Sequence, residues 1–192
     1  IEPRLARPQR PDNLPALLER AAQPIAASRR LVAEQRYTEA ALELERALRY
    51  APNHPQIHEA LALLHWQAGN LERAKSHATQ ALETSPESAT AHYIVGRCRA
   101  AAGDKQGALA EFRTALLCGD FGADAEVAAL CHFHLAETLA AEGYLTAALK
   151  QYEAFGQQAT ASPPPEKSEL VSLLATRRGS VSEARSRVLE KL

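Results

Sequence analysis

An alanine returns at a fixed interval along this chain. Ala40, Ala74 and Ala108 are equally spaced, and seven positions after each of them stands a second alanine, at Ala47, Ala81 and Ala115. Positions seven apart share one face of an α-helix. The spacing of the first alanines matches the period of about 34 residues that is typical of stacked helix–turn–helix units. The sequence therefore predicts an array of repeated helix pairs.

The period changes toward the C-terminus. The next equivalent alanine, Ala148, lies six positions later than the spacing of Ala40, Ala74 and Ala108 predicts. The six extra positions fall around 118–127, CGDFGADAEV, where we expect a longer, partly ordered connection that carries Phe121. Ala184 follows Ala148 at an interval two positions longer than the first one, and it predicts a fifth repeat of altered length.

The composition favours an all-α fold. Apolar residues make up 46% of the chain and aromatic residues only 5%, and the apolar share is carried by Ala and Leu, which are strong helix formers. A net charge of -1 argues against nucleic-acid binding through phosphate neutralisation. No apolar run approaches the roughly 18 residues that a membrane span requires. Three cysteines without a CxxC motif argue against a disulfide framework, but they do not settle the compartment.

Prolines and glycines divide the helical pattern. Pro24 either ends a first helix or begins the next. Later helices end before Pro52 and Pro86, and turns within helix pairs are expected at Gly69, Gly103 and Gly143. The predicted helices cover 14–23, 25–35, 37–48, 56–67, 71–84, 90–102, 105–117, 126–142, 145–157, 168–176 and 181–192. The predicted organisation is a tail or linker over 1–13, a repeat array over 14–160 with units near 21–54, 55–88, 89–122 and 129–160, a proline-rich linker over 161–167, and a divergent or truncated repeat over 168–192.

The segment 1–13 is rich in proline and arginine. Pro3, Pro8 and Pro11 exclude a helix there. Arginines recur at every third position, a spacing that a polyproline II conformation places on one edge, at Arg4, Arg7 and Arg10. We expect a solvated tail, with a basic docking arm as the alternative.

The second helix of each unit carries a recurring pattern of residues. The first small position holds Ala40, Ala74, Ala108 and Ala148. The large position after it holds Leu44, Ala78, Phe112 and Tyr152, and the second small position holds Ala47, Ala81, Ala115 and, in the fourth unit, Phe155. Two units end in proline, at Pro52 and Pro86. This pattern resembles the tetratricopeptide repeat over about residues 21–160.

The first helices match that repeat less closely. Its Leu-Gly position holds Leu61-Ala62, Val95-Gly96 and Leu135-Ala136, its Trp position holds His58, His92 and His132, and its Tyr position holds Leu31, His65, Arg99 and Leu139. The resemblance implies an all-α, right-handed α-solenoid of antiparallel helix pairs with about four to five units. Small residues let helix axes approach closely, so Phe155 predicts altered packing beside the last repeat.

Neither a metal centre nor a catalytic site is indicated by the motifs. Cys131 and His134 could share a helix face, but a closed zinc site needs about four converging ligands. His58, His92 and His132 occupy one repeat position, which predicts a shared packing role. GxSxG, HExxH and glycine-rich phosphate-loop motifs are absent from the sequence. We therefore expect a non-enzyme without a cofactor.

In the tetratricopeptide repeat family, the first helices line a concave groove. The positions that match it are Arg29 and Val32 in the first unit, Glu59, Leu63, Trp66 and Gln67 in the second, Tyr93 and Arg97 in the third, and Leu130, Phe133 and Glu137 in the fourth. Trp, Tyr and Arg most often anchor interfaces, so an exposed strip of Trp66, Tyr93, Arg97 and Phe133 is expected. In the alternative, Tyr93 and Phe133 pack between helices.

Family members that bind chaperone C-terminal tails hold the carboxylate with a clamp of Lys, Asn and Arg. The Asn position here holds Leu63, Arg97 or Glu137, and the first Lys position holds Glu59, Tyr93 or Phe133. The resemblance therefore implies a groove that disfavours a terminal carboxylate.

Two functions fit these observations. The first is a scaffold that binds a peptide or protein segment in the groove, without nucleic acid or a membrane span. The alternative is the regulatory or oligomerising part of a longer chain whose catalytic or transport module is not in this sequence, because the chain lacks Met and starts at Ile1. An apolar face over 181–192 could accept a further repeat or form a homo-oligomer, through Val181, Ala184, Val188, Leu189 and Leu192.

Overall fold

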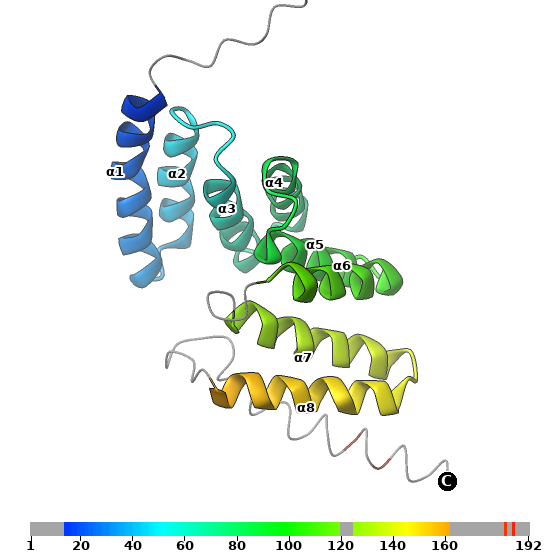
Figure 1. Ribbon diagram of the computed structural model, residues 1–192. Coiled ribbons are helices and arrows are strands. Elements are labelled where there is room, and N and C mark those ends of the chain that lie inside the picture. The colour runs from blue at the N-terminus through cyan, green and yellow to red at the C-terminus, as the bar shows by residue number, and fades with distance from the viewer. Residues whose placement is uncertain (1–13, 120–124, 162–182, 184–185, 187–192) are drawn as a thin grey trace, which may run out of the picture.

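The computed structural model describes residues 14–119, 125–161, 183 and 186 (Figure 1). Within these residues the chain forms eight helices and no strand. The helices are α1 (Leu14–Ala33), α2 (Tyr37–Leu48), α3 (Pro55–Gln67), α4 (Leu71–Thr84), α5 (Ala89–Ala101), α6 (Lys105–Cys118), α7 (Ala125–Ala141) and α8 (Leu145–Ala161). The fold is thus the expected all-α helical repeat solenoid.

The helices stack as four antiparallel pairs, α1/α2, α3/α4, α5/α6 and α7/α8. Each pair turns relative to the one before, so that α7 and α8 run across the direction of α1 and α2 (Figure 1). The odd-numbered helices α3, α5 and α7 contact one another along the stack, whereas successive even-numbered helices make no comparable contact in the described part of the chain. Helices on the inner side of a curved stack lie closer together, so the odd-numbered helices form the inner face.

One turn motif closes all four pairs. In the second pair, the Gly69 amide donates to the Trp66 carbonyl at 2.9 Å and the Asn70 amide donates to the His65 carbonyl at 2.8 Å, a Schellman pattern. The central residue has positive φ in every pair: 62° at Gln35, 77° at Gly69, 83° at Gly103 and 85° at Gly143. Glycine tolerates this backbone because it lacks a Cβ, and Gln35 is the exception.

The repeated alanines lie at the contacts between helices. Ala40, Ala74, Ala108 and Ala148 are all 0% exposed. Gly96 shows why small residues are needed, because a Cβ there would lie 2.7 Å from Cε1 of Phe112. In the fourth pair, Phe155 replaces the second alanine and is also fully buried, with its ring centroid 5.3 Å from that of Phe133.

The prediction of two helices over 14–23 and 25–35 is wrong, because α1 is one helix that contains Pro24. A proline inside a helix removes the hydrogen bond to the carbonyl four residues earlier, which here belongs to Arg20. Arg20 is exposed, so solvent can replace that bond.

Several predictions lie outside the described residues. They are the tail over 1–13, the placement of Phe121, the linker beyond Ala161 and, apart from residues 183 and 186, the helices over 168–176 and 181–192. Among the described helices, none combines the length and hydrophobicity needed to cross a membrane.

Candidate functional site

A row of stacked side chains crosses the inner face from α3 to α7. Arg97 of α5 places its guanidinium carbon 4.5 Å from the ring centroid of Trp66 on α3 and 5.6 Å from that of Tyr93. Its Nη1 donates to the Tyr93 hydroxyl at 2.5 Å and to Nε2 of His134 on α7 at 2.6 Å. We call Trp66, Tyr93, Arg97 and His134 the arginine row.

His134 is a neutral acceptor within the arginine row. Since an arginine nitrogen can only donate, Nε2 of His134 must carry a lone pair and its proton resides on Nδ1. Burial, reinforced by the charge of Arg97, lowers the pKa of His134 from 6.5 to about 3. His134 therefore stays neutral near neutral pH and holds the Arg97 side chain in one orientation.

Tyr93 and Phe133 are only 3% and 4% exposed, which corrects the expected strip of exposed aromatic residues. Their rings instead pack between helices: Tyr93 lies 6.2 Å from Phe112 and Phe133 lies 5.2 Å from His134, between ring centroids. The close approach of α5 and α7 on the inner side of the stack leaves no room for solvent around these rings. Leu130 is buried as well, at 7% exposed.

Trp66 and Arg97 keep part of their surface accessible, since both are half-buried. Leu63 and Gln67, which flank Trp66 on α3, are exposed. The accessible part of the predicted groove is therefore centred on the end of α3 and the middle of α5.

The remaining predicted groove residues have other neighbours. Glu59 accepts a hydrogen bond at 2.5 Å from the Ser88 hydroxyl, ahead of α5, and Glu137 accepts one from the Tyr152 hydroxyl of α8. Arg29 and Val32 are exposed on α1, which packs on α2 at the far end of the stack from α7 (Figure 1). The structure therefore does not bring them to the arginine row.

The predicted shared packing role of the repeated histidines is confirmed. His58 contacts the Pro52 carbonyl through Nε2 at 2.7 Å, and His92 contacts the Pro86 carbonyl in the same way at 3.0 Å. Nδ1 of each repeated histidine contacts the residue 19 positions later, on the second helix of its pair; these contacts are His58–His77, His92–Glu111 and His132–Gln151. The histidine position thus ties both helices of a pair together.

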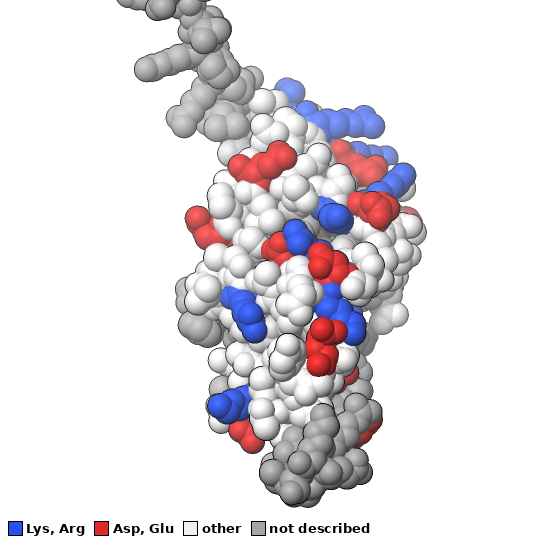
Figure 2. Space-filling view, turned by 90° about the vertical axis from the view of Figure 1, so that its right-hand side faces the viewer, with Lys and Arg blue, Asp and Glu red and all other residues white. Residues whose placement is uncertain are grey.

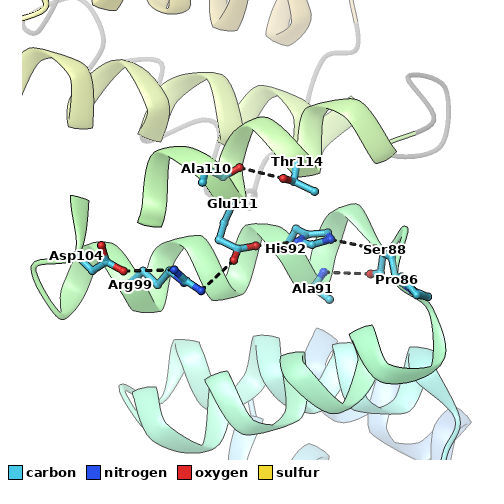
Figure 3. A network of polar contacts seen from close by, with 9 residues as sticks. All are labelled: Pro86, Ser88, Ala91, His92, Arg99, Asp104, Ala110, Glu111 and Thr114. Atoms are coloured by element: carbon cyan, nitrogen blue, oxygen red, sulfur yellow. Dashed lines mark hydrogen bonds and ion pairs between the residues drawn. The ribbon is translucent and has the colours of Figure 1, made fainter. Parts of the chain in front are cut away.

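In the third pair this position belongs to a charged network (Figure 3). Glu111 of α6 lies 2.8 Å from Nδ1 of His92 and 3.3 Å from Arg99 of α5. Arg99 also approaches Asp104 at 3.4 Å, and Asp104 caps α6 by accepting a hydrogen bond from the Gly107 amide. Because a carbonyl and a carboxylate both only accept, the two His92 contacts are both hydrogen bonds only when each ring nitrogen carries a proton.

Cys98 and Cys131 lie in surroundings that keep their thiols protonated. Burial raises the pKa of Cys98 and raises that of Cys131 to about 12, and a protonated thiol is a poor nucleophile. Across residues 14–119 and 125–161, no three His, Cys, Asp or Glu side chains converge to hold a metal ion.

Charge on the side of the molecule shown in Figure 2 is mixed. Acidic and basic side chains are interspersed there, and neither sign forms a continuous patch. This distribution matches the net charge of -1 and does not favour a phosphate backbone as ligand on that side.

His134 is the residue of the arginine row that was not predicted from the sequence. The pattern suggested only a shared face with Cys131, because contact with Arg97 depends on how two helix pairs stack. No signal in the sequence links two positions 37 residues apart in successive units.

Two sequence models described as tetratricopeptide repeat match the chain, one over residues 59–126 and the other over residues 31–77. No curated protein sequence matches it.

Several solved structures share the fold. The first tetratricopeptide repeat domain of Spaghetti (RPAP3), bound to the HSP90 peptide SRMEEVD, is 15% identical with a TM-score of 0.58, over 66% of this chain and 95% of that one. The crystal structure of MamA protein is 17% identical with a TM-score of 0.59, over 86% of each chain. MamA from Desulfovibrio magneticus RS-1 is 13% identical with a TM-score of 0.61, over 75% of this chain and 78% of that one. These similarities concern the helical-repeat fold.

Proposed function

Because this chain belongs to the tetratricopeptide repeat family, we propose that it is a protein-interaction scaffold that binds a peptide or protein segment along the inner face of α3, α5 and α7. Proteins of this family are generally non-catalytic scaffolds, and a protein-interaction role follows from the family.

The observation that carries this proposal is the stacking of Arg97 on Trp66. Both side chains are half-buried, and Arg97 is held by Tyr93 and His134. A side chain that is already ordered loses little conformational entropy when a ligand binds. Trp and Arg are also the residues that most often dominate interface energetics. The pair is therefore suited to anchor a partner.

The neighbouring residues indicate the chemistry of the segment. Leu63 lies three residues before Trp66 on α3, so the two side chains share one helix face and offer an apolar surface. Arg97 adds a fixed positive charge beside that surface. The segment should therefore present an apolar side chain next to an acidic side chain or a main-chain carbonyl.

A free C-terminus should not be required of that segment. The clamp residues are replaced in this chain, and the carboxylates of Glu59 and Glu137 on the inner helices disfavour a second negative charge close to them. Peptides with an amidated C-terminus should bind as well as the free acids, which separates this groove from the carboxylate-binding type.

Selection from a random peptide library against the purified chain, followed by affinity measurement on the selected peptide, tests the proposal. Trp66→Ala and Arg97→Ala should each weaken binding at least about tenfold, which corresponds to roughly 1.4 kcal/mol. Leu117→Ala is the matched control, because Leu117 is 86% exposed on α6, away from the inner face. Unchanged affinity in both groove variants, with helix content intact, would contradict the proposal.

The alternative of an oligomerising segment concerns residues 168–192, almost all outside the described part of the chain. It stays a prediction. Sedimentation at several protein concentrations tests it, and a monomer at every concentration would count against self-association.

A further inference from the structure

Three histidines meet between α3 and α4. His58 and His65 of α3 are both 6% exposed, and His77 of α4 lies between them. Its ring centroid is 5.4 Å from that of His58 and 5.5 Å from that of His65. The His65 and His77 rings are nearly parallel, with an interplanar angle of 4°. We call His58, His65 and His77 the histidine cluster.

The hydrogen bonds of the cluster determine its tautomers. Nε2 of His58 donates to the Pro52 carbonyl, because a carbonyl can only accept. In the neutral ring, Nδ1 of His58 is therefore an acceptor, and Nδ1 of His77, 3.1 Å away, is its donor. Nε2 of His65 is buried without a hydrogen-bond partner. Both hydrogen bonds of His58 are made when the rings of His58 and His77 are neutral.

A second proton on the His58–His77 pair conflicts with this arrangement. A first proton can enter at Nε2 of His77 without breaking the Nδ1–Nδ1 hydrogen bond, and the hydrogen bond of His77 with Gln80 favours it. A second proton, on His58, places two N–H groups against each other. A proton on His65 creates a charge beside His77 that is shielded from solvent. Burial is the main cause that lowers the pKa of both His65 and His77.

The charges from neighbouring elements partly oppose each other. Arg73 of α4 disfavours a proton on His65, whereas Glu45 of α2 favours a proton on His65 and His77. Among the described residues of α5, which also packs on α3 and α4, no charge is found to act on His65 or His77. Within the cluster, the charges that His58 and His65 carry when protonated disfavour a proton on His77 and lower its pKa.

The same position in the next pair has a carboxylate as its partner instead of a histidine. His92 faces the Glu111 carboxylate, so the protonated ring satisfies both the carboxylate and the Pro86 carbonyl. In the fourth pair, His132 faces the neutral amide of Gln151. One repeat position thus has three partners of different chemical type, namely a histidine, a carboxylate and an amide.

We propose that mild acidification loosens the α3–α4 pair through the histidine cluster, while the His92–Glu111 contact holds the α5–α6 pair closed. Burial lowers the pKa of His65 and His77 from the ordinary value of 6.5. As the pH falls through that ordinary value, the unfolded chain therefore takes up protons that these two buried rings resist, and the stability that they contribute at higher pH is lost. This inference concerns the stability of two helix pairs and does not rest on the proposed function.

Loosening α3 also affects the arginine row. Trp66 follows His65 directly and lies in the last turn of α3, so its stacking on Arg97 of α5 depends on the position of α3. Trp66 is the single tryptophan of the chain, and its fluorescence therefore reports on this helix alone.

Hydrogen exchange of the full chain at pH 7.5 and 5.5, expressed as protection factors, tests the proposal. In the wild type, amides of α3 and α4 should lose about tenfold in protection at the lower pH, and those of α5 and α6 should not. Trp66 emission should shift to longer wavelength over the same pH range.

The chain itself suggests matched variants. His77→Gln copies the partner of the fourth pair and should abolish the acid-induced loss. His77→Glu copies the partner of the third pair and should reverse it, so that protection of α3 and α4 rises on acidification. Glu111→Gln should change the pH response of α5 and α6 while α3 and α4 respond as in the wild type.

Three outcomes would overturn the inference. One is a wild type whose α3–α4 protection does not change with pH. The second is a His77→Gln variant that loses as much protection as the wild type. The third is protection of α3 and α4 that depends on added zinc and is removed by a chelator, which would make the cluster a metal site. A proton titration of the histidine ring signals of the wild type by NMR gives the same decision if a variant fails to fold.

Discussion

At the scale of single residues, the structure separates side chains that look equivalent in the sequence. Trp66, Tyr93 and Phe133 are all aromatic residues on first helices, yet only Trp66 is half-exposed, whereas the other two lie in the core. The difference arises because α5 and α7 contact each other on the inner side of the stack. Burial also sets the state of His134, which is neutral and orients Arg97.

Replacing His134 with Phe should weaken the decrease in the free energy of unfolding that acidic pH causes. The pKa of His134 is about 3 in the folded protein and ordinarily 6.5, so the unfolded chain binds a proton that the folded chain does not. The contribution of His134 is complete above pH 6.5 and is lost as the pH falls toward 3. At pH 5 the loss is about 2 kcal/mol.

Urea unfolding at pH 7.5 and 5.0 measures this effect. The wild type should lose about 2 kcal/mol more than His134→Phe between the two pH values. Equal losses in the two proteins would show that His134 takes up its proton in the folded state as readily as in the unfolded state.

At the scale of helices and turns, one backbone motif closes all four pairs. The glycines at 69, 103 and 143 provide the positive φ that it needs, and Gln35 adopts the same conformation at 62° with a side chain present. A left-handed conformation costs roughly 1–2 kcal/mol for a residue with a Cβ. The first pair is therefore closed under strain that the other three avoid.

Gln35→Gly should raise the free energy of unfolding by about 0.5–1 kcal/mol, because relief of the left-handed strain exceeds the added entropy of the unfolded chain. Gly69→Ala is the opposite change in the same motif. No atom lies within 4 Å of the added Cβ, so its expected loss of about 1 kcal/mol comes from the backbone alone. Chemical denaturation measures the free energy of unfolding of both variants. Changes of the same sign in the two variants would contradict the proposed strain at Gln35.

At the scale of the whole molecule, the core is divided. One cluster of buried residues joins α1, α2 and α3, and a larger one runs from α3 to α8. Among the described helices, the extensive contacts of each pair are with its neighbours, as in other solenoids, whose stability is approximately a sum over units and interfaces. A destabilising substitution in one helix pair should therefore affect that pair and its neighbours and leave distant pairs unchanged.

Leu44→Ala tests this division. Leu44 is 3% exposed in the smaller cluster, and its truncation should cost about 2–5 kcal/mol. Hydrogen exchange should show the loss of protection in α1, α2 and α3, with α7 and α8 unchanged. Phe112→Leu, in the larger cluster, is the matched control and should leave α1 and α2 unchanged. A uniform loss over all eight described helices would mean that the chain unfolds as one unit.

Local residue patterns were sufficient to predict most of the helices. The interval between Ala40, Ala74 and Ala108 indicated the repeat, and the predicted helix over 71–84 has those bounds as α4. Such features depend on neighbours within one or two turns, which a sequence displays directly. Pro24 is the local failure, because one proline in an exposed helix is tolerated when solvent can satisfy the freed carbonyl.

The sequence by itself determined the all-α repeat, the turns within pairs and the shared position of His58, His92 and His132. Only the tertiary structure decided which aromatic residues remain accessible, that His134 holds Arg97, and that His77, Glu111 and Gln151 face the repeated histidines. The physical reason is that helix formation follows from short-range periodicity, whereas burial and protonation depend on how closely neighbouring pairs stack. Residues 37 positions apart, such as Arg97 and His134, meet only through that stacking.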